Sequence, residues 1–231
     1  MSSIAIITAR GGSKRIPKKN IRSFLGKPII AYSIETALSS GIFDEVMVST
    51  DSQEIADVAV KYGAKVPFLR SAKNSDDHSS TADVVEEVLL EYKKQGKEFD
   101  SVCCIYPTAP FITSERLQES MKLLKDVSAD SIVPVTSFSY PIWRSFKIDS
   151  DGRIKMNWPE NMNSRSQDLP PAYHDCGQFY CLNAPEFLTQ KKLFMDKTFP
   201  IIVSELEVQD IDNEEDWKMA ELKYGIVNKK M

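Results

Sequence analysis

Short apolar runs alternate with segments of helical periodicity along most of this chain. The run at 2–9 is nearly continuous, which is typical of a strand buried on both faces of a sheet. Similar runs at 44–50 and 100–106 also predict strands, whereas 28–40 and 81–94 carry apolar side chains at helical spacing. This alternation predicts an α/β fold in which helices cover both faces of a mainly parallel sheet.

The remaining elements follow from the same patterns. Further strands are expected at 65–69, 131–136, 177–182 and 201–203, and further helices at 51–62, 114–126, near 185–190 and from 213 onward. Ser52 is a candidate helix cap, and Gly41 and Gly63 are expected to end helices. The helix at 28–40 is expected to turn one side to the core, formed by Ile29, Tyr32, Ser33, Ala37 and Leu38.

The pattern changes between 137 and 175, where prolines and aromatic residues accumulate. Asp151-Gly152 lies between two short apolar segments and predicts a β-hairpin. We therefore expect one domain over 1–231 with an inserted β-rich lobe at about 137–175. The aromatic residues of this lobe can form a subunit interface or a local core.

Composition excludes several protein classes. The chain has 231 residues, 42% of them hydrophobic and 27% charged, which is typical of a folded globular protein. The apolar runs are too short for a membrane span, and the N-terminus lacks the pattern of a signal peptide. The four cysteines and two histidines lack metal-binding spacing, so we expect buried thiols in a protein of the reducing cytoplasm.

Charge is distributed unevenly. Of the 29 Lys and Arg residues, seven lie in 1–34, which has no Asp or Glu, so the rest of the chain has 22 basic and 33 acidic residues. A local basic segment on an acidic protein favours a small polyanionic ligand, because nucleic-acid binders are more often basic over a whole face.

The basic segment contains the sequence ARGGSKRIPKKN directly after the first expected strand. Gly11 and Gly12 allow backbone N–H groups to approach phosphate oxygens, and the neighbouring lysines and arginines can neutralise phosphate charge. Neither the Walker A pattern nor the G-x-G-x-x-G pattern occurs, which disfavours ATPases, GTPases and hydride-transfer enzymes. The loop therefore predicts a triphosphate site, with a solvated basic turn as the alternative.

Three acidic residues and one histidine have two interpretations each. In an extended segment, Asp210 and Asp212 would point to the same side, as in a magnesium site or as in a solvated turn. Asp51 follows another expected strand and can serve a ligand or cap the helix that begins near Ser52. His174, beside Asp175, can polarise a substrate hydroxyl, although a solvated histidine is the simpler interpretation.

Five sequence blocks, taken in order, resemble the N-acylneuraminate cytidylyltransferases (CMP-sialic acid synthetases). They are ARGGSKRIPKKN, STDS, YPTAPF, RSQDLPPAYHDCGQFY and QDID. Together with SDDHSSTAD and CCIYPTAPF, they are most similar to the pseudaminic acid cytidylyltransferase branch. The resemblance implies a Rossmann-like nucleotidyltransferase fold and a Mg²⁺-dependent transfer of CMP from CTP to a nine-carbon nonulosonic acid, with release of pyrophosphate.

The resemblance also implies roles for individual residues. Arg10, Lys14 and Lys19 are the expected catalytic residues. The expected CTP-binding residues are Arg10, Gly11, Gly12, Ser13, Lys14, Asn20, Arg70, Ser79, Ser80 and Thr81. Tyr106, Arg165, Gln167 and His174 are expected near the sugar, and Asp210 and Asp212 are expected to bind the metal. The family uses a lobe of the partner subunit at this site, which implies a homodimer.

Three positions depart from the sialic acid pattern. Arg15 replaces the usual Gly, Tyr106 replaces the usual Gln, and His174-Asp175 is unusual. These differences favour a dideoxy-diamino nonulosonic acid. Together with the similarity to the pseudaminic acid branch, they make pseudaminic acid the expected substrate, with CMP-N-acetylneuraminate or CMP-legionaminate synthesis as alternatives.

Other functions are less consistent with the sequence. A CMP synthase for 3-deoxy-octulosonic acid would share the opening, but it would not share the KKN and RSQD residues. A glycosyltransferase would place Asp-x-Asp in mid-domain, and a non-catalytic nucleotide-binding regulator would not need the complete set of charged residues.

Overall fold

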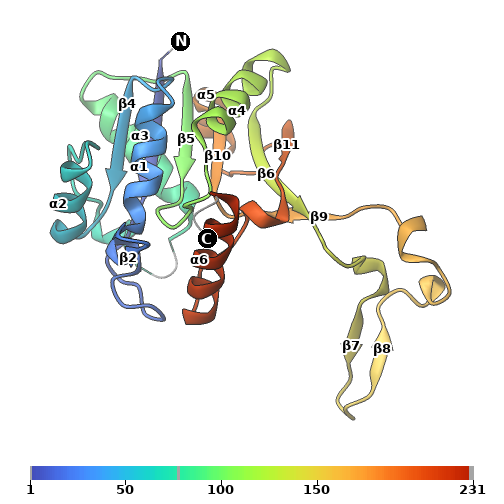
Figure 1. Cartoon of the computed structure of the whole chain (residues 1–231). Helices are drawn as coiled ribbons and strands as arrows, with labels where there is room; N and C mark the ends of the chain where they lie inside the picture. Colours follow the sequence, from blue (N-terminus) through green and yellow to red (C-terminus); the bar gives the residue numbers. More distant parts are fainter. Residues whose placement is uncertain (1, 77–78, 229–231) are drawn as a thin grey trace.

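A central β-sheet organises the protein (Figure 1). The computed structural model describes residues 2–76 and 79–228. The strands of the central sheet are β1 (Ser3–Thr8), β4 (Glu45–Ser49), β5 (Ser101–Ile105), β6 (Ser131–Ser137), β9 (Tyr173–Asp175), β10 (Phe179–Asn183) and β11 (Thr198–Ile202). Their order is β11-β6-β10-β5-β1-β4, and β9 pairs with β6 beside this path.

The sheet is mainly parallel, as the alternation of patterns predicts. β1 runs parallel to β4 and β5, and β11 runs parallel to β6. β10 is antiparallel to both β5 and β6. The chain leaves β1 toward β4 on one side and later returns to β5 on the other side, so the strand order reverses between β1 and β5.

Helices cover both faces of the sheet. They are α1 (Ile29–Ser39), α2 (Gln53–Lys61), α3 (Thr81–Lys94), α4 (Ser114–Asp126), α5 (Ala184–Gln190) and α6 (Glu214–Val227). Successive side chains of β1 point to opposite faces. Ala5 and Ile7 pack in the core with α1, α2 and α4, whereas Ile4 and Ile6 pack in the core with α3 and α5.

Local signals set several helix ends where the sequence predicts them. α3 and α4 have the expected bounds. Ser52 caps α2, since its hydroxyl accepts a hydrogen bond from the Ile55 N–H, and Ser80 caps α3 through a capping box with Asp83. Gly41, with φ of 66°, follows α1 in the left-handed conformation that glycine favours.

Two sequence predictions are wrong. No strand forms at 65–69: Lys65 makes a single bridge to Met47, because Pro67 has no N–H to extend the pairing. Leu38 does not face the core, since it is 43% exposed, while the other four predicted residues of α1 are buried.

Short elements complete the domain. β2 (Ser23–Phe24) pairs with β3 (Lys27–Pro28) in a small antiparallel ribbon before α1. The 3₁₀ helices of the domain are η1 (Lys19–Ile21), η2 (Ala72–Asn74) and η6 (Glu205–Glu207).

The segment that follows β6 projects away from the sheet (Figure 1). β7 (Phe146–Ile148) and β8 (Ile154–Met156) form the hairpin that Asp151-Gly152 predicts, with Gly152 at φ of 78°. The segment also contains η3 (Ile142–Arg144), η4 (Pro159–Asn161) and η5 (Ser166–Asp168). Several of its apolar side chains remain exposed, including Ile148 at 74% and Ile154 at 67%.

The four cysteines are buried and free, as the sequence predicts. Burial raises the pKa of Cys104 and of Cys176 to about 12, so neither thiol is prepared to act as a nucleophile at neutral pH. None of the helices in the described part of the chain combines the length and apolarity that a membrane span requires.

Candidate active site

A cavity of about 550 Å³ opens beyond the carboxyl ends of β1 and β5. Thr8 ends β1 at its wall, and Tyr106 follows β5 there. This position is where the strand order reverses, which is the usual ligand position in open α/β sheets. The other lining residues are Arg10, Ser13, Lys14, Arg15, Ile16, Lys19, Asn20, Arg70, Asn74, Asp76, Ser79, Ser80, Thr81, Val84, Pro107, Thr108 and Asp212.

The cavity brings together most of the residues that the sequence indicates. Those that line it are Arg10, Ser13, Lys14, Lys19, Asn20, Arg70, Ser79, Ser80, Thr81, Tyr106 and Asp212. The expected site residues that do not line it are Gly11, Gly12, Arg165, Gln167, His174 and Asp210. Five basic and two acidic residues surround the space, so its charge suits a polyanionic ligand.

Arg70 is a buried cation at one wall of the cavity. It is 8% exposed, and its Nε and Nη2 donate hydrogen bonds to the side-chain and backbone oxygens of Ser49 at 3.0 and 2.5 Å. Burial lowers the pKa of the guanidinium from its ordinary value, although an arginine remains charged at neutral pH. A fixed cation of this kind can bind an electron-rich group without first losing side-chain entropy.

The basic loop at 9–20, which follows β1, is held closed by the buried side-chain amide of Asn20. Asn20 is 5% exposed, and its Nδ2 donates a hydrogen bond of 2.9 Å to the Arg10 carbonyl across the loop. Lys19, next to it in η1, turns its Nζ to the Ile211 carbonyl at 2.6 Å. Asn20 therefore closes the loop, and Lys19 connects it to the segment that precedes α6.

A small apolar core joins this loop to α6. Ile16 and Phe24 pack with Ile211 and Trp217, and the rings of Phe24 and Trp217 have centroids 5.6 Å apart. Ile211 is fully buried, as its place between two aspartates predicts. This core brings residues near 210 to the basic loop, although almost 200 positions separate them in sequence.

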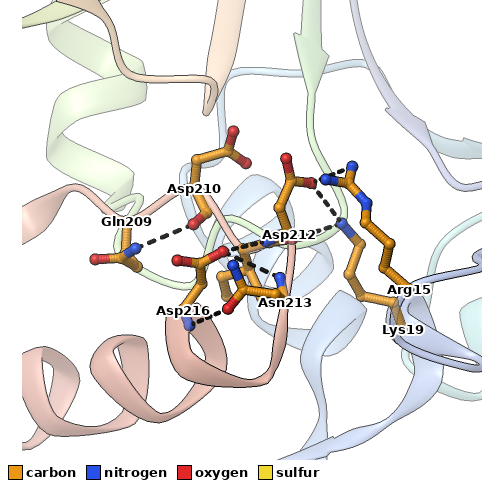
Figure 2. Close-up of polar contacts among 8 residues, drawn as sticks. Arg15, Lys19, Gln209, Asp210, Asp212, Asn213 and Asp216 are labelled. Carbon is orange, nitrogen blue, oxygen red and sulfur yellow. Dashed lines mark hydrogen bonds and ion pairs between the residues drawn. The ribbon is translucent and has the colours of Figure 1, made fainter. Parts of the chain in front are cut away.

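Asp212 lies between two cations of the basic loop (Figure 2). Its Oδ1 is 2.8 Å from the Arg15 guanidinium and 3.7 Å from Lys19 Nζ. The Asp210 and Asp212 carboxylates point to the same side of the segment (Figure 2). Desolvation and the negative charge of Asp212 raise the pKa of Asp210 above its ordinary value.

The donor set fits a hard divalent cation that also binds substrate. The described residues contain no cluster of three or more His, Cys, Asp or Glu side chains that would enclose a metal by themselves. Two neighbouring carboxylates plus phosphate oxygens from a ligand are instead the type of set that Mg²⁺ accepts. Burial first, and then the charge of Asp212, disfavour the ionised form of Asp210 and raise its pKa, and a bound cation would oppose both effects.

The opposite wall is formed at the beginning of α3. Ser80 is occupied as the helix cap, and the Thr81 hydroxyl is 3.1 Å from the Tyr106 hydroxyl. Burial raises the pKa of Tyr106. Behind Tyr106, the Tyr180 hydroxyl donates a hydrogen bond of 2.5 Å to the Asp175 carboxylate at the end of the projecting segment.

The three candidate residues of the projecting segment lie outside this cavity. Arg165 pairs with Asp168 at 2.6 Å, and both side chains are exposed. His174 lies in β9, where its ring is 4.8 Å from that of Phe138. Within one chain, Arg165, Gln167 and His174 therefore do not line the cavity. His78, the other histidine, lies outside the described residues.

Several lining residues were not singled out as candidate site residues from the sequence. Asn74 and Asp76 belong to the connection between Arg70 and α3, where Asp76 lies inside the SDDHSSTAD block and Asn74 directly precedes it. The Asp76 carbonyl accepts a hydrogen bond of 3.0 Å from Arg10. Thr108 lies inside the YPTAPF block and Arg15 lies in the basic segment, so the sequence blocks could have indicated both as site residues.

Known proteins resemble this chain over nearly its full length. It is 42% identical over 226 residues to a pseudaminic acid cytidylyltransferase of Campylobacter jejuni, covering 98% of this chain and 97% of that protein. It is 39% identical over 230 residues to a CMP-N,N'-diacetyllegionaminic acid synthase of Legionella pneumophila, covering 96% and 95% of the two chains.

A solved structure of CMP:2-keto-3-deoxy-manno-octonic acid synthetase complexed with CTP has the same fold. It superposes with a TM-score of 0.69 over the whole of both chains, at 17% identity. The family model described as cytidylyltransferase matches residues 4–222, which include the basic loop, the strands of the sheet and the aspartates before α6. From its sheet, its site and this match, the chain belongs to the cytidylyltransferase family.

Proposed function

We propose that this protein transfers CMP from CTP to a nine-carbon nonulosonic acid, pseudaminic acid, and releases pyrophosphate. The observation that carries the proposal is the 42% identity to a pseudaminic acid cytidylyltransferase over 98% of the chain. The cationic cavity beyond the carboxyl ends of β1 and β5 supports it, because its size and charge suit a nucleoside triphosphate.

In the proposed reaction, the anomeric hydroxyl of the acid attacks the α-phosphorus of CTP in line. A new phosphorus–oxygen bond forms, the bond to the β-phosphate breaks, pyrophosphate leaves and the hydroxyl proton is released. Arg10, Lys14 and Lys19 are the proposed catalytic residues, because they bring positive charge to the side of the cavity where phosphates would lie. Ser13 and Asn20 complete the phosphate loop.

The base of CTP is proposed to lie toward Arg70. The guanidinium is fixed by Ser49, so it presents a set direction to a carbonyl oxygen of the base. Ser79, Ser80 and Thr81 are proposed to line the adjoining part of the nucleotide site, at the N-terminus of α3.

The proposed cofactor is Mg²⁺, held by Asp210 and Asp212 together with phosphate oxygens of CTP. When bound there, it would neutralise phosphate charge during the transfer. Arg15 and Lys19, which contact Asp212 in this structure, would be available to the phosphates if Asp212 held the metal.

Tyr106 is the proposed determinant of the acceptor. Its half-buried ring stands at the end of β5 and offers an apolar face to the less polar dideoxy-diamino sugars. The alternative acceptors are legionaminic acid, which one relative's name indicates, and N-acetylneuraminic acid. We expect Tyr106→Gln to shift the ratio of kcat/KM values toward N-acetylneuraminic acid, and an unchanged ratio would remove Tyr106 from the acceptor site.

We further propose that the protein acts as a homodimer through the lobe at about 137–175. The exposed apolar side chains of its hairpin support this, since a monomer would leave them in water. In this arrangement Arg165, Gln167 and His174 of one subunit approach the acceptor in the cavity of the other. A cytoplasmic location is proposed from the burial of four free thiols.

The experiment that tests the proposed function compares three acceptors. Purified protein is incubated with CTP and Mg²⁺ and with pseudaminic, legionaminic or N-acetylneuraminic acid in turn, and pyrophosphate release is measured. The highest kcat/KM is expected with pseudaminic acid. Higher efficiency with another acid would keep the chemistry and reject the acceptor, whereas CTP binding without turnover on all three would favour a regulatory protein.

A further inference from the structure

Asp51 lies where β4 ends and contacts the basic loop at its first glycine. We propose that Asp51 is a positioning residue for nucleotide binding: its carboxylate holds the Gly11 N–H and thereby fixes the path of the loop from Arg10 to Lys14. The inference rests on the proposed function, since it assigns to Asp51 a part in binding the phosphates of CTP.

The contact is direct and local. Asp51 Oδ1 accepts a hydrogen bond of 2.8 Å from the Gly11 N–H. A Cβ atom on residue 11 would lie 3.1 Å from the Ser52 Cβ, so the loop approaches the beginning of α2 more closely than most residues would permit. Gly11 therefore serves loop packing, and its N–H is used within the protein.

The structure explains the acidic residue at position 51. The helix cap of α2 is Ser52, whose hydroxyl accepts from the Ile55 N–H, so Asp51 is not needed as a cap. A negative charge near a site for a polyanion weakens the binding of that ligand, so a carboxylate at this position is expected to have a structural role. That role is to accept the hydrogen bond from the Gly11 N–H.

The segment 49–52 connects both halves of the site. Ser49 accepts hydrogen bonds from Arg70 and, through its carbonyl, from the Ala9 N–H at 2.9 Å. Asp51 holds Gly11 two residues later. The end of β4 thus sets the base-side arginine and the phosphate loop from one short stretch of backbone. The charge of Asp51 also acts on Arg70, where it opposes the lowering of the pKa by burial. The hydrogen bond to Gly11, by contrast, is made to the phosphate loop alone.

The test compares Asp51→Ala with Asp51→Asn. Asparagine keeps an oxygen acceptor for Gly11 but removes the charge, whereas alanine removes both. Dissociation constants for CTP and for cytidine are measured by ligand-observed NMR titration, and kcat and KM for CTP by pyrophosphate release. Asp57→Ala is the matched control, because Asp57 is an exposed acid of α2 that contacts Gln53.

Asp51→Ala should weaken CTP binding about tenfold, as expected for the loss of one hydrogen bond that orders charged groups, and should weaken cytidine binding much less. Asp51→Asn and Asp57→Ala should bind CTP at least as tightly as the wild type. Equal weakening of CTP and cytidine by Asp51→Ala would indicate general structural damage and would overturn the proposal.

Two further results would also overturn it: wild-type affinity of Asp51→Ala for CTP, or loss of affinity in Asp51→Asn equal to that in Asp51→Ala. If the wild type binds no CTP, both the proposed function and the role of Asp51 are rejected. If the wild type binds CTP and only the variants deviate from expectation, the proposed function stands and the role of Asp51 is rejected.

Discussion

Lys18 and Lys19 are neighbours in sequence but have different environments. Lys19 points into the cavity and is 21% exposed at its side chain, whereas Lys18 is 66% exposed and pairs with Glu54 on α2. We predict that Lys19→Ala lowers kcat about 100-fold or more, as for the loss of a group that stabilises the transition state. The rate of pyrophosphate release measures this effect.

Lys18→Ala is the matched control for that variant. It removes the same charge one residue earlier, outside the cavity, and should leave kcat close to that of the wild type. Equal losses in the two variants would mean that net charge of the loop matters and the position of Lys19 does not.

Asp212 is the second residue whose removal is informative. We predict that Asp212→Ala abolishes Mg²⁺-dependent turnover, because one of the two proposed metal carboxylates is lost. The fold should remain, since Asp212 is half-exposed and its side chain contacts Arg15 and Lys19 at the surface. Circular dichroism checks the fold. Mg²⁺-dependent turnover that persists in Asp212→Ala would contradict the assignment of Asp212 as a metal ligand.

At the scale of single residues, sequence motifs locate the site but not the contacts within it. The ARGGSKRIPKKN block predicts a phosphate loop, and the structure places seven of its side chains at the cavity wall: Arg10, Ser13, Lys14, Arg15, Ile16, Lys19 and Asn20. The bond between Gly11 and Asp51 crosses 40 positions and depends on how the loop folds back. Spacing alone could not distinguish that role from a helix cap.

At the scale of elements, a buried carboxylate joins β4 to α3 and the residues after it. Glu45 is 6% exposed, and its side chain accepts hydrogen bonds from Tyr92, Lys97 and Lys65. Burial acts to raise the pKa of Glu45, but the hydrogen bonds from Lys97, Tyr92 and Lys65 outweigh it and lower the pKa.

The lowered pKa predicts a pH-dependent effect on stability. A carboxylate whose folded pKa lies below its unfolded value stabilises the fold above the unfolded pKa of about 4.5, and this stabilisation disappears as pH falls through the folded pKa. Glu45→Gln should therefore lower the free energy of unfolding by about 2 kcal/mol at pH 7, since a hydrogen-bonded charge is lost. The difference from the wild type should shrink in acid.

Urea unfolding at pH 7 and at pH 3 measures both values. Glu98→Gln is the control, because Glu98 is 71% exposed and its pair with Lys93 should contribute little. A Glu45→Gln effect of equal size at both pH values would contradict the electrostatic explanation.

Elements with strong local signals could be predicted from the sequence. α3 and α4 have capping residues and apolar periodicity, so their bounds agree with the sequence prediction. The direction of β10 could not be predicted, because a single apolar strand pattern fits parallel and antiparallel pairing alike. At 65–69 the apolar pattern suggested a strand, and Pro67 limited pairing to one bridge.

In the molecule as a whole, the lobe projects away from the sheet (Figure 1). Arg165 belongs to this lobe and does not line the cavity of its own chain. The sequence predicted the hairpin and its position in the chain, since Asp151-Gly152 is a local signal. Where the lobe would lie relative to a second subunit depends on contacts between chains, and no local pattern encodes these contacts.

The proposed dimer predicts complementation between two inactive variants. Lys19→Ala damages the cavity of its own chain, and Arg165→Ala damages the lobe that would serve the partner. In a mixed dimer one site receives an intact cavity and an intact lobe, so co-expression should restore about a quarter of wild-type activity for random pairing. Activity no higher than that of the single variants would mean that Arg165 does not act across subunits.

We propose above that CMP and a nonulosonic acid are joined in the cavity beyond the carboxyl ends of β1 and β5. The most direct measurement is ³¹P NMR of a reaction containing protein, CTP, Mg²⁺ and pseudaminic acid. The three CTP signals should be replaced by one phosphodiester signal and by pyrophosphate in equal molar amounts, and CTP should stay intact without the acid. CTP that remains unchanged in the complete mixture, or that breaks down equally without the acid, would contradict it.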